Sequence, residues 1–233
     1  MDTKKNKKTL RAALIASIPV MTGYIVMGTA FGIMLADKGY NALWALGMSI
    51  TMYAGSMQFV AVDILSRGAS LISAAIMTLL VNARHIVYGI SMLGKYRKIG
   101  KIKPYLIFAL TDETYALLSA EVPDNLNEKL YYFAVSLLDQ LYWIIGCVFG
   151  ALLGSKLTIN TNGIDFAMTA LFIVIFTEQW LSTGDHVPAI LGVVITLVCL
   201  VVLGSENFLI PAMILIVICL SVYGRFTDKK AAG

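Results

Sequence analysis

Long apolar runs dominate this sequence, and they restrict the folds open to it. A helix needs about 20 apolar residues to span the hydrocarbon core of a bilayer. Eight runs reach or approach that length: Ala12–Ala36, Ala42–Leu65, Ala69–Leu93, Pro104–Ala120, Leu130–Gly154, Ile164–Leu181, Val187–Leu203 and Phe208–Tyr223. Short connections rich in turn-forming residues join them, so we expect one helical domain over residues 1–233.

The composition indicates that lipid is the main solvent of the chain. Apolar residues make up 58% of the sequence and charged residues only 14%, and the mean hydropathy is +0.79. Soluble domains carry about 25% charged residues. These values exclude a cytosolic enzyme, a nucleic-acid-binding module and a disordered protein. The first run exceeds the roughly 7–15 apolar residues of a signal peptide, so we expect a transmembrane helix there.

Basic residues predict how the helices cross the membrane. Three blocks occur, in residues 1–11, in Lys95–Lys103 and in 224–233, and all three should be cytoplasmic, which places both termini there. Three runs separate the first two blocks and five separate the last two, yet two cytoplasmic ends need an even number of crossings. Each stretch should therefore contain a segment that is divided or fails to cross. We predict an all-α polytopic transmembrane helical bundle of about 6–8 helical segments, with broken or re-entrant helices near Asn82–His85 and Thr111–Glu113.

Three charges lie in the middle of two apolar runs, and they are the first candidates for function. They are Arg84, Asp112 and Glu113. A charge at the centre of a bilayer helix costs at least ~2.5–3.5 kcal/mol, and such residues usually serve a function. Either they form a buried ion pair that locks two helices together, or they line a polar cavity. In a cavity Arg84 would hold an anionic group while one acid accepts a cation or a proton, and an amino acid zwitterion supplies both charges.

Helical periodicity groups other polar residues with these charges. Two faces are predicted, Arg84 with Tyr88 and Ser91, and Asp112 with Tyr115 and Ser119. Glu113 points about 100° away from Asp112 on an unbroken helix. One acid should therefore face the cavity, and the other a neighbouring helix or the arginine. We favour Asp112 for the cavity.

Other ionisable residues rank below these. His85 either relays a proton or is a neutral side chain bonded to a neighbouring carbonyl, and His186 is expected to be a loop residue. Asp139 and Glu178 lie nearer the ends of their runs, where we expect water or headgroups to reach them, and we keep Asp139 as a second-rank candidate. The three Cys residues lie inside apolar runs without a neighbouring His, so we expect no disulfide and no metal site.

Two further motifs concern helix packing. Gln58 ends the segment Tyr53-Ala54-Gly55-Ser56-Met57-Gln58, and at mid-depth it needs a partner, either another helix or a substrate. The Gly-Ser pair in this segment is a place where a helix can kink. The first run carries small residues that predict a tightly packed face, with a moving gate or a contact with a second subunit as alternatives. These residues are Pro19, Gly23, Gly28 and Gly32.

Taken together, these elements resemble the AzlC family, the large subunit of bacterial branched-chain amino acid exporters. They are the glycine series from Pro19 to Gly32, the segment Tyr53–Gln58, Asn82-Ala83-Arg84-His85 followed by Tyr88, and Thr111-Asp112-Glu113-x-Tyr115. The resemblance implies an exporter of leucine, isoleucine and valine, with methionine as a further candidate, driven by proton antiport. It also implies a multi-pass protein of the bacterial inner membrane that works with a small AzlD-type membrane subunit.

Residue roles follow from the chemistry and the resemblance together. Substrate binding is expected of Arg84, Asn82, Gln58, Tyr53, Tyr88 and Tyr115, proton coupling of Asp112, Glu113 and His85, and packing or gating of Pro19, Gly23, Gly28 and Gly32. Besides the small subunit, the amino acid and the lipid bilayer are the expected partners. We expect no catalytic residue, cofactor, metal or nucleic acid, because the sequence lacks enzyme motifs such as H-E-x-x-H. The alternatives are a channel, or an assembly subunit of a membrane complex whose partner carries the transport residues.

Overall fold

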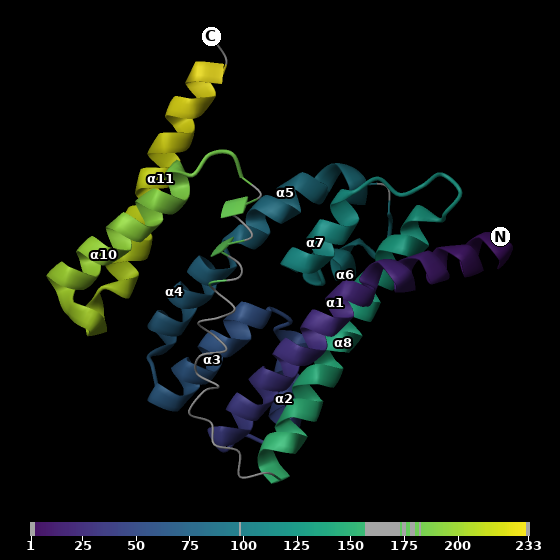
Figure 1. Ribbon diagram of the computed structural model, residues 1–233, viewed down its shortest axis with the longest axis horizontal. Helices are drawn as coiled ribbons and strands as arrows, with labels where there is room; N and C mark the ends of the chain where they lie inside the picture. Colours follow the sequence, from purple (N-terminus) through teal and green to yellow (C-terminus); the bar gives the residue numbers. More distant parts are fainter. Residues whose placement is uncertain are drawn as a thin grey trace. The chain divides into compact units, whose positions relative to one another are not determined.

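Helices form all the regular structure that the computed structural model describes, which covers residues 3–97, 99–156, 173, 176–177, 180–181 and 183–231. In chain order they are α1 (Thr3–Asp37), α2 (Ala42–Thr51), α3 (Gly55–Arg67), α4 (Leu71–Asn82), α5 (Arg84–Tyr96), α6 (Lys103–Phe108), α7 (Asp112–Ser119), α8 (Glu128–Lys156), α10 (Val187–Asn207) and α11 (Leu209–Ala231) (Figure 1). Glu178 and most of the run Ile164–Leu181 lie outside the described residues.

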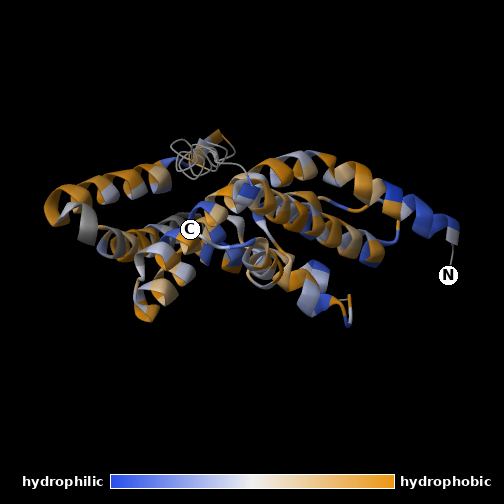
Figure 2. Cartoon of the chain, turned by 90° about the horizontal axis from the view of Figure 1, so that it is seen from below, coloured by the Kyte–Doolittle hydropathy of each residue, from blue (hydrophilic) through white to orange (hydrophobic). Residues whose placement is uncertain are grey.

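Several of these helices suit a bilayer. Among the described residues, α1, α8 and the part of α10 over Val187–Gly204 are each long and apolar enough to cross a membrane, and the bent pair of α4 and α5 forms a fourth such segment. Figure 2 shows apolar residues along most helices and hydrophilic ones at the N-terminal end of α1. At 1.5 Å per residue, α1 is about 50 Å long, so its basic end extends beyond the hydrocarbon core. The prediction of an all-helical, polytopic membrane protein is confirmed.

The chain divides into two compact units, each described here by itself. The first comprises the described residues of Met1–Ala74 and Val81–Thr169, and the second those of Ala75–Leu80 and Ala170–Gly233. In the second unit, α10 packs along α11 after a kink at Gly204, whose φ of 75° suits glycine. The single domain expected over residues 1–233 stays a prediction.

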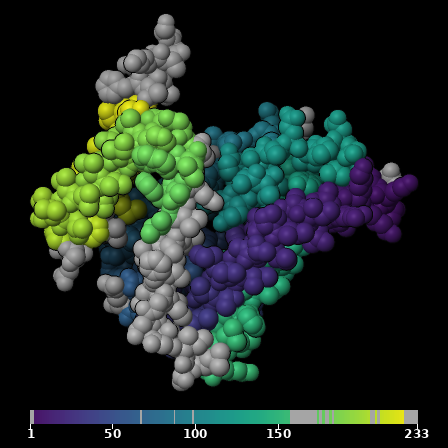
Figure 3. Space-filling view, viewed as in Figure 1, coloured from purple at the N-terminus to yellow at the C-terminus, as the bar shows by residue number. Residues whose placement is uncertain are grey.

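Glycines bring α1 and α8 into backbone contact, and this pair is the centre of the first unit. A Cβ atom at Gly32 would clash with the carbonyl oxygen of Cys147, and one at Gly150 with the carbonyl oxygen of Thr29. Gly28 meets the backbone of Cys147 in the same way. In Figure 3 α1 forms a continuous purple ridge bordered by teal atoms of the same unit. Small residues allow this close approach, which replaces the hydrophobic driving force that is missing between helices in lipid.

Three apolar runs are interrupted near their middles, and the residues of the candidate site lie beside these breaks. The runs predicted to break near Asn82–His85 and Thr111–Glu113 do so: α4 and α5 bend by 45° at Ala83, and α6 and α7 are separated by residues 109–111. The run Ala42–Leu65, expected as one segment with a kink at its Gly-Ser pair, is also divided, because α2 ends at Thr51 and α3 begins at Gly55. Between them Tyr53 has a φ of 39°, in the left-handed region that a tyrosine seldom adopts.

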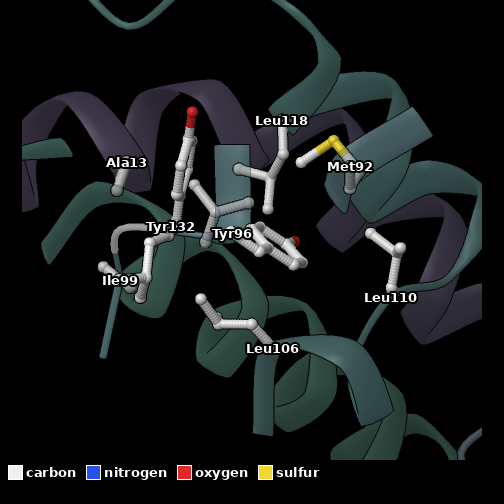
Figure 4. Close-up of a cluster of buried hydrophobic side chains, with 10 residues drawn as sticks. Ala13, Met92, Tyr96, Ile99, Leu106, Leu110, Leu118 and Tyr132 are labelled. Carbon is white, nitrogen blue, oxygen red and sulfur yellow. The ribbon is translucent and has the colours of Figure 1, made fainter. Parts of the chain in front are cut away.

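A cluster of buried side chains holds the short helices against α1 and α8. Tyr96 from α5 meets Tyr132 from α8 edge to face, with ring centroids 5.9 Å apart (Figure 4). Leu106 from α6 and Leu118 from α7 pack beside them, and all four side chains are less than 2% exposed. The cluster therefore joins α5, α6, α7 and α8, and none of its members is charged.

We predict that Gly32→Ala lowers the thermal stability of the purified protein. The added methyl group would force the backbones of α1 and α8 apart, and overpacking of this kind costs about 1–3 kcal/mol. Gly23→Ala is the matched control on the same helix, because a Cβ atom there meets nothing within 4 Å. Thermal unfolding in detergent compares the two variants with the wild type. Equal melting temperatures for all three would contradict the close contact.

Candidate functional site

Three helices of the first unit begin at one place, and polar side chains join their first residues. Ser56 is the second residue of α3, while Arg84 and Asp112 are the first residues of α5 and α7. Nη2 of Arg84 donates to Oγ of Ser56 over 2.6 Å, and Nη1 lies 2.5 Å from Oδ2 of Asp112. Both charges lie beside helix N-termini, which carry partial positive charge. That field favours the aspartate and opposes the arginine, so the arginine depends on its carboxylate partner.

The ion pair is only partly enclosed and is not saturated with hydrogen bonds. The side chains of Arg84 and Asp112 are 23% and 26% exposed. Nε of Arg84 and Oδ1 of Asp112 are buried, and neither has a hydrogen-bond partner among the described residues. Most buried polar atoms in proteins are hydrogen-bonded, so free capacity at a charged pair invites a ligand or water. The pair can therefore accept additional polar groups without being broken.

The two polar faces predicted beside these charges pack against each other. Tyr88 of α5 stacks on Tyr115 of α7 with ring centroids 4.7 Å apart and an interplanar angle of 16°. The hydroxyl groups of Tyr115 and Ser91 are 3.0 Å apart. Aromatic stacking adds about 0.5–1.5 kcal/mol beyond simple burial. This contact fixes the rotation of α5 relative to α7, and so aligns Arg84 with Asp112.

Lys95 fixes the other end of α7, a role that the sequence did not indicate. Its ammonium group donates to the carbonyl oxygens of Leu118, Ser119 and Ala120 at 3.0, 2.6 and 2.8 Å. These carbonyls end the helix, where cations are favourable, and the three bonds use all three donors of the ammonium group. In the sequence Lys95 contributes only to the positive charge of its loop. The last turn of α5 thus holds the last turn of α7.

The two neighbouring acids face different partners. Asp112 pairs with Arg84, whereas Glu113 accepts a 2.7 Å hydrogen bond from the hydroxyl group of Tyr24 on α1. The same hydroxyl lies 2.7 Å from Oγ1 of Thr111. Thr111 also caps α7, because its Oγ1 accepts from the backbone N–H of Thr114. Glu113 is exposed within this unit, and its side chain faces a neighbouring helix rather than the arginine.

Asp139 does not lie where the sequence analysis placed it. We expected water or headgroups to reach this residue, but its side chain is 0% exposed in the middle of α8. Its Oδ2 accepts a 2.8 Å hydrogen bond from Thr114, and its Oδ1 has no partner among the described residues. A signal was present: Asp139 shares a helical face with Gly146 and Gly150, and that face is the one turned toward α1.

The remaining predicted residues surround the breaks and differ in their contacts. Gln58 is completely buried, and its side-chain oxygen accepts a 2.7 Å bond from the indole of Trp143. Tyr53 is also buried. The side-chain oxygen of Asn82 is buried without a partner in the part of the chain described. Nδ1 of His85 lies 3.2 Å from the carbonyl oxygen of Asn82, and its role in proton coupling stays a prediction.

A groove of about 520 Å³ lies in the second unit and is lined mostly by apolar side chains. His186 stacks there on Trp180, with ring centroids 4.1 Å apart. Arg84 and Asp112 are not among its lining residues. The cavity expected around the ion pair therefore stays a prediction.

Comparisons with known proteins identify the family of this chain. The sequence matches the model of the AzlC protein family over residues 19–157, a stretch that contains all three breaks and both members of the ion pair. The chain belongs to the AzlC family. It is 41% identical to the "Branched-chain amino acid transport protein AzlC" of Bacillus subtilis (strain 168), over 98% of this chain and 92% of that protein.

Two more relatives place the AzlC-family chain among membrane proteins. An "Uncharacterized membrane protein" of Helicobacter pylori (strain ATCC 700392 / 26695) is 44% identical over 94% of this chain and 96% of that protein. The "Inner membrane protein YgaZ" of Escherichia coli (strain K12) is 29% identical over 72% of this chain and 70% of that protein. No solved structure matches the chain.

We predict that Lys95→Met loosens α7 in this AzlC-family protein. Hydrogen bonds to a charged group contribute about 1.5–3 kcal/mol, so amide hydrogen exchange in α7 should accelerate by about tenfold or more. Lys101→Met is the matched control, because it removes a charge from the same basic block without touching α7. Hydrogen-exchange mass spectrometry of both variants makes the comparison, and equal exchange in α7 would show that the lysine does not hold the helix.

Proposed function

We propose that this AzlC-family chain exports the branched-chain amino acids leucine, isoleucine and valine, with methionine as a further substrate, in exchange for protons. The Bacillus subtilis relative matches nearly the whole chain, and its name supports the substrate class. The name of the Escherichia coli relative supports the inner membrane as its location. A transport protein among the relatives also favours transport over an enzyme.

The observation that carries the proposal is the ion pair at the three helix starts. In this proposal the substrate's carboxylate binds Arg84 and its ammonium group binds Asp112. A zwitterion that inserts between them replaces one ion pair with two, so the net charge at this depth remains zero. Buried charges are tolerated where they stay paired and hydrogen-bonded. The N-termini of α3 and α5 favour the same carboxylate through their dipoles.

Aromatic and amide side chains would complete the substrate site. The stacked rings of Tyr88 and Tyr115 lie on the helices that carry the ion pair, and they offer an apolar surface to a branched side chain. Tyr53, Gln58 and Asn82 flank the breaks in the α2–α3 and α4–α5 runs, and we assign them to substrate recognition. Each has a polar atom that is buried without a partner among the described residues.

Proton coupling is assigned to the acid that has no arginine partner. Asp112 is occupied by Arg84, whereas Glu113 contacts only hydroxyl and backbone groups and is exposed. Glu113 therefore carries the proton in this proposal, and His85, which follows Arg84 in α5, is assigned to the same proton coupling. A small AzlD-type subunit completes the transporter, and both termini face the cytoplasm, as the basic blocks indicate.

Two other functions fit part of the same geometry. In an assembly subunit, the ion pair would only lock α5 to α7, and the partner would supply the transport residues. In a channel, the pair would line a pore without exchange of protons. The two alternatives differ from the exporter in their response to neutralising the pair and to a proton gradient.

We predict that Arg84→Gln or Asp112→Asn lowers export by more than about tenfold, because each removes a charged hydrogen bond worth about 1.5–3 kcal/mol. The double variant Arg84→Gln/Asp112→Asn leaves no unpaired charge, so it should fold better than either single variant and still fail to export. The assay is efflux of labelled leucine and valine from reconstituted vesicles across a pH gradient, with and without a co-expressed AzlD-type subunit. Lys38→Gln, which removes the exposed pair between Lys38 and Asp37, is the control.

Normal export by the double variant would contradict the substrate site and favour a structural lock. Efflux that is independent of the proton gradient would favour a channel. A wild-type protein that exports none of the branched-chain amino acids would overturn the substrate assignment.

A further inference from the structure

We propose that Asp139 is a second proton-carrying residue of transport, joined to Glu113 by a relay of three hydroxyl groups. The relay runs through Tyr24, Thr111 and Thr114. This inference rests on the proposed proton antiport and extends it from the exposed acid to an acid in the interior of the first unit.

The relay is a continuous series of short hydrogen bonds across three helices. The hydroxyl oxygen of Tyr24 on α1 lies 2.7 Å from Oε2 of Glu113 and 2.7 Å from Oγ1 of Thr111. Oγ1 of Thr111 lies 3.0 Å from Oγ1 of Thr114 on α7, which donates over 2.8 Å to Oδ2 of Asp139 on α8. All four distances lie in the range of ordinary O–H···O hydrogen bonds. The four hydrogen bonds therefore connect Glu113 to Asp139 without a gap.

A count of the available hydrogens indicates that the two acids share a proton. The series has four hydrogen bonds, but its three hydroxyl groups supply only three hydrogens. If both carboxyl groups were ionised, one of the four contacts would bring two oxygen atoms together with no hydrogen between them. One carboxyl proton provides the fourth hydrogen, and every bond is then satisfied in one direction. Coupled acids that share a proton titrate as a pair.

The surroundings of Asp139 favour a proton rather than a metal ion or a cation partner. Its side chain is fully buried, and within the described ranges no lysine or arginine forms a salt bridge with it. The ionisable groups near it are Glu113, Tyr53, Tyr105 and Tyr131. Those near Glu113 are Asp112, Arg84, Tyr24, Tyr53 and Tyr88. A buried carboxylate without a cation partner is costly, and a proton is the usual way to neutralise it.

A transfer along the relay keeps every atom balanced. When Glu113 holds the proton, each oxygen donates toward Asp139. As Glu113 gives its proton to Tyr24, the hydrogens of Tyr24, Thr111 and Thr114 each pass to the next oxygen, and Asp139 gains one. One O–H bond breaks and one forms at each hydroxyl, the direction of the series reverses, and the net result is one proton moved from α7 to α8. Glu113 is thereby free to accept another proton from outside.

The test breaks the relay at two points in the whole chain of residues 1–233. Thr114→Val removes the hydroxyl next to Asp139 with little change in shape, and Tyr24→Phe removes the hydroxyl next to Glu113 while keeping the ring that packs against Trp143. Thr114→Ser restores a hydroxyl group as the conservative variant. Tyr142→Phe is the matched control, because this hydroxyl lies at the same α1–α8 interface, 3.3 Å from Ser17 and outside the relay. Each variant is reconstituted and assayed for proton-driven leucine transport and for leucine–leucine exchange.

Both breaks should reduce proton-driven transport far more than exchange, by about 100-fold, the usual contribution of a positioned proton-transfer group. Thr114→Ser and Tyr142→Phe should keep the wild-type ratio of the two rates. If Thr114→Val and Tyr24→Phe keep that ratio as well, the relay is wrong. If Tyr142→Phe loses it to the same extent, the effect comes from the interface, and the relay is also wrong.

Infrared spectroscopy of the purified protein tests the shared proton without any transported substrate. The carbonyl band of a protonated carboxyl group should disappear in Asp139→Asn, shift in Thr114→Val, and appear at a different pH in Glu113→Gln. A band of this kind that is unchanged by Asp139→Asn at every pH overturns the proposal. If wild-type vesicles fail to export while the band behaves as expected, the proposed function fails and the proton-sharing pair of acids stands.

Discussion

The cost of holding charge at membrane depth organises the first unit. Arg84 begins a helix, where the backbone dipole opposes a cation, so it requires a carboxylate and a hydroxyl acceptor beside it. Asp112 and Ser56 meet that need only because α7 and α3 begin at the same place. Three apolar runs must therefore be interrupted together. The unusual backbone at Tyr53, the stacked tyrosines and the lysine that holds the end of α7 are all conditions for that meeting.

Two adjacent acids divide two tasks in the proposed mechanism. Asp112 pairs with the guanidinium group of Arg84, whereas Glu113 accepts a hydrogen bond from the hydroxyl group of Tyr24 and carries the proton in the proposal. The substrate site and the proton path thus begin one residue apart on α7. A small rotation of this short helix would move both at once. Coupling of this kind needs no long pathway between separate sites.

Much of this arrangement is predictable from the sequence, because a charged residue inside a membrane-spanning apolar run is rare and easily recognised. The breaks beside Arg84 and Asp112 were predicted from polar residues at mid-run and from the parity of the basic blocks. The break at Tyr53 was not, because its residues lack the Asn, Asp or Gly that mark a left-handed backbone. The enclosure of Asp139 was mispredicted, since position along a run does not tell which helix covers a face. Lys95 was treated as a topological charge, because its acceptors are backbone atoms that only the fold brings near.

The backbone contact between α1 and α8 has a consequence for movement. Ridges of side chains can shift past one another by changing rotamers, but main-chain atoms in direct contact have no such freedom. Displacing either helix by one residue would bring a residue with a Cβ atom to a position that only glycine fits. The two long helices must therefore move as one rigid body. Any alternation of access within the first unit has to come from movement of the short, interrupted helices relative to α1 and α8.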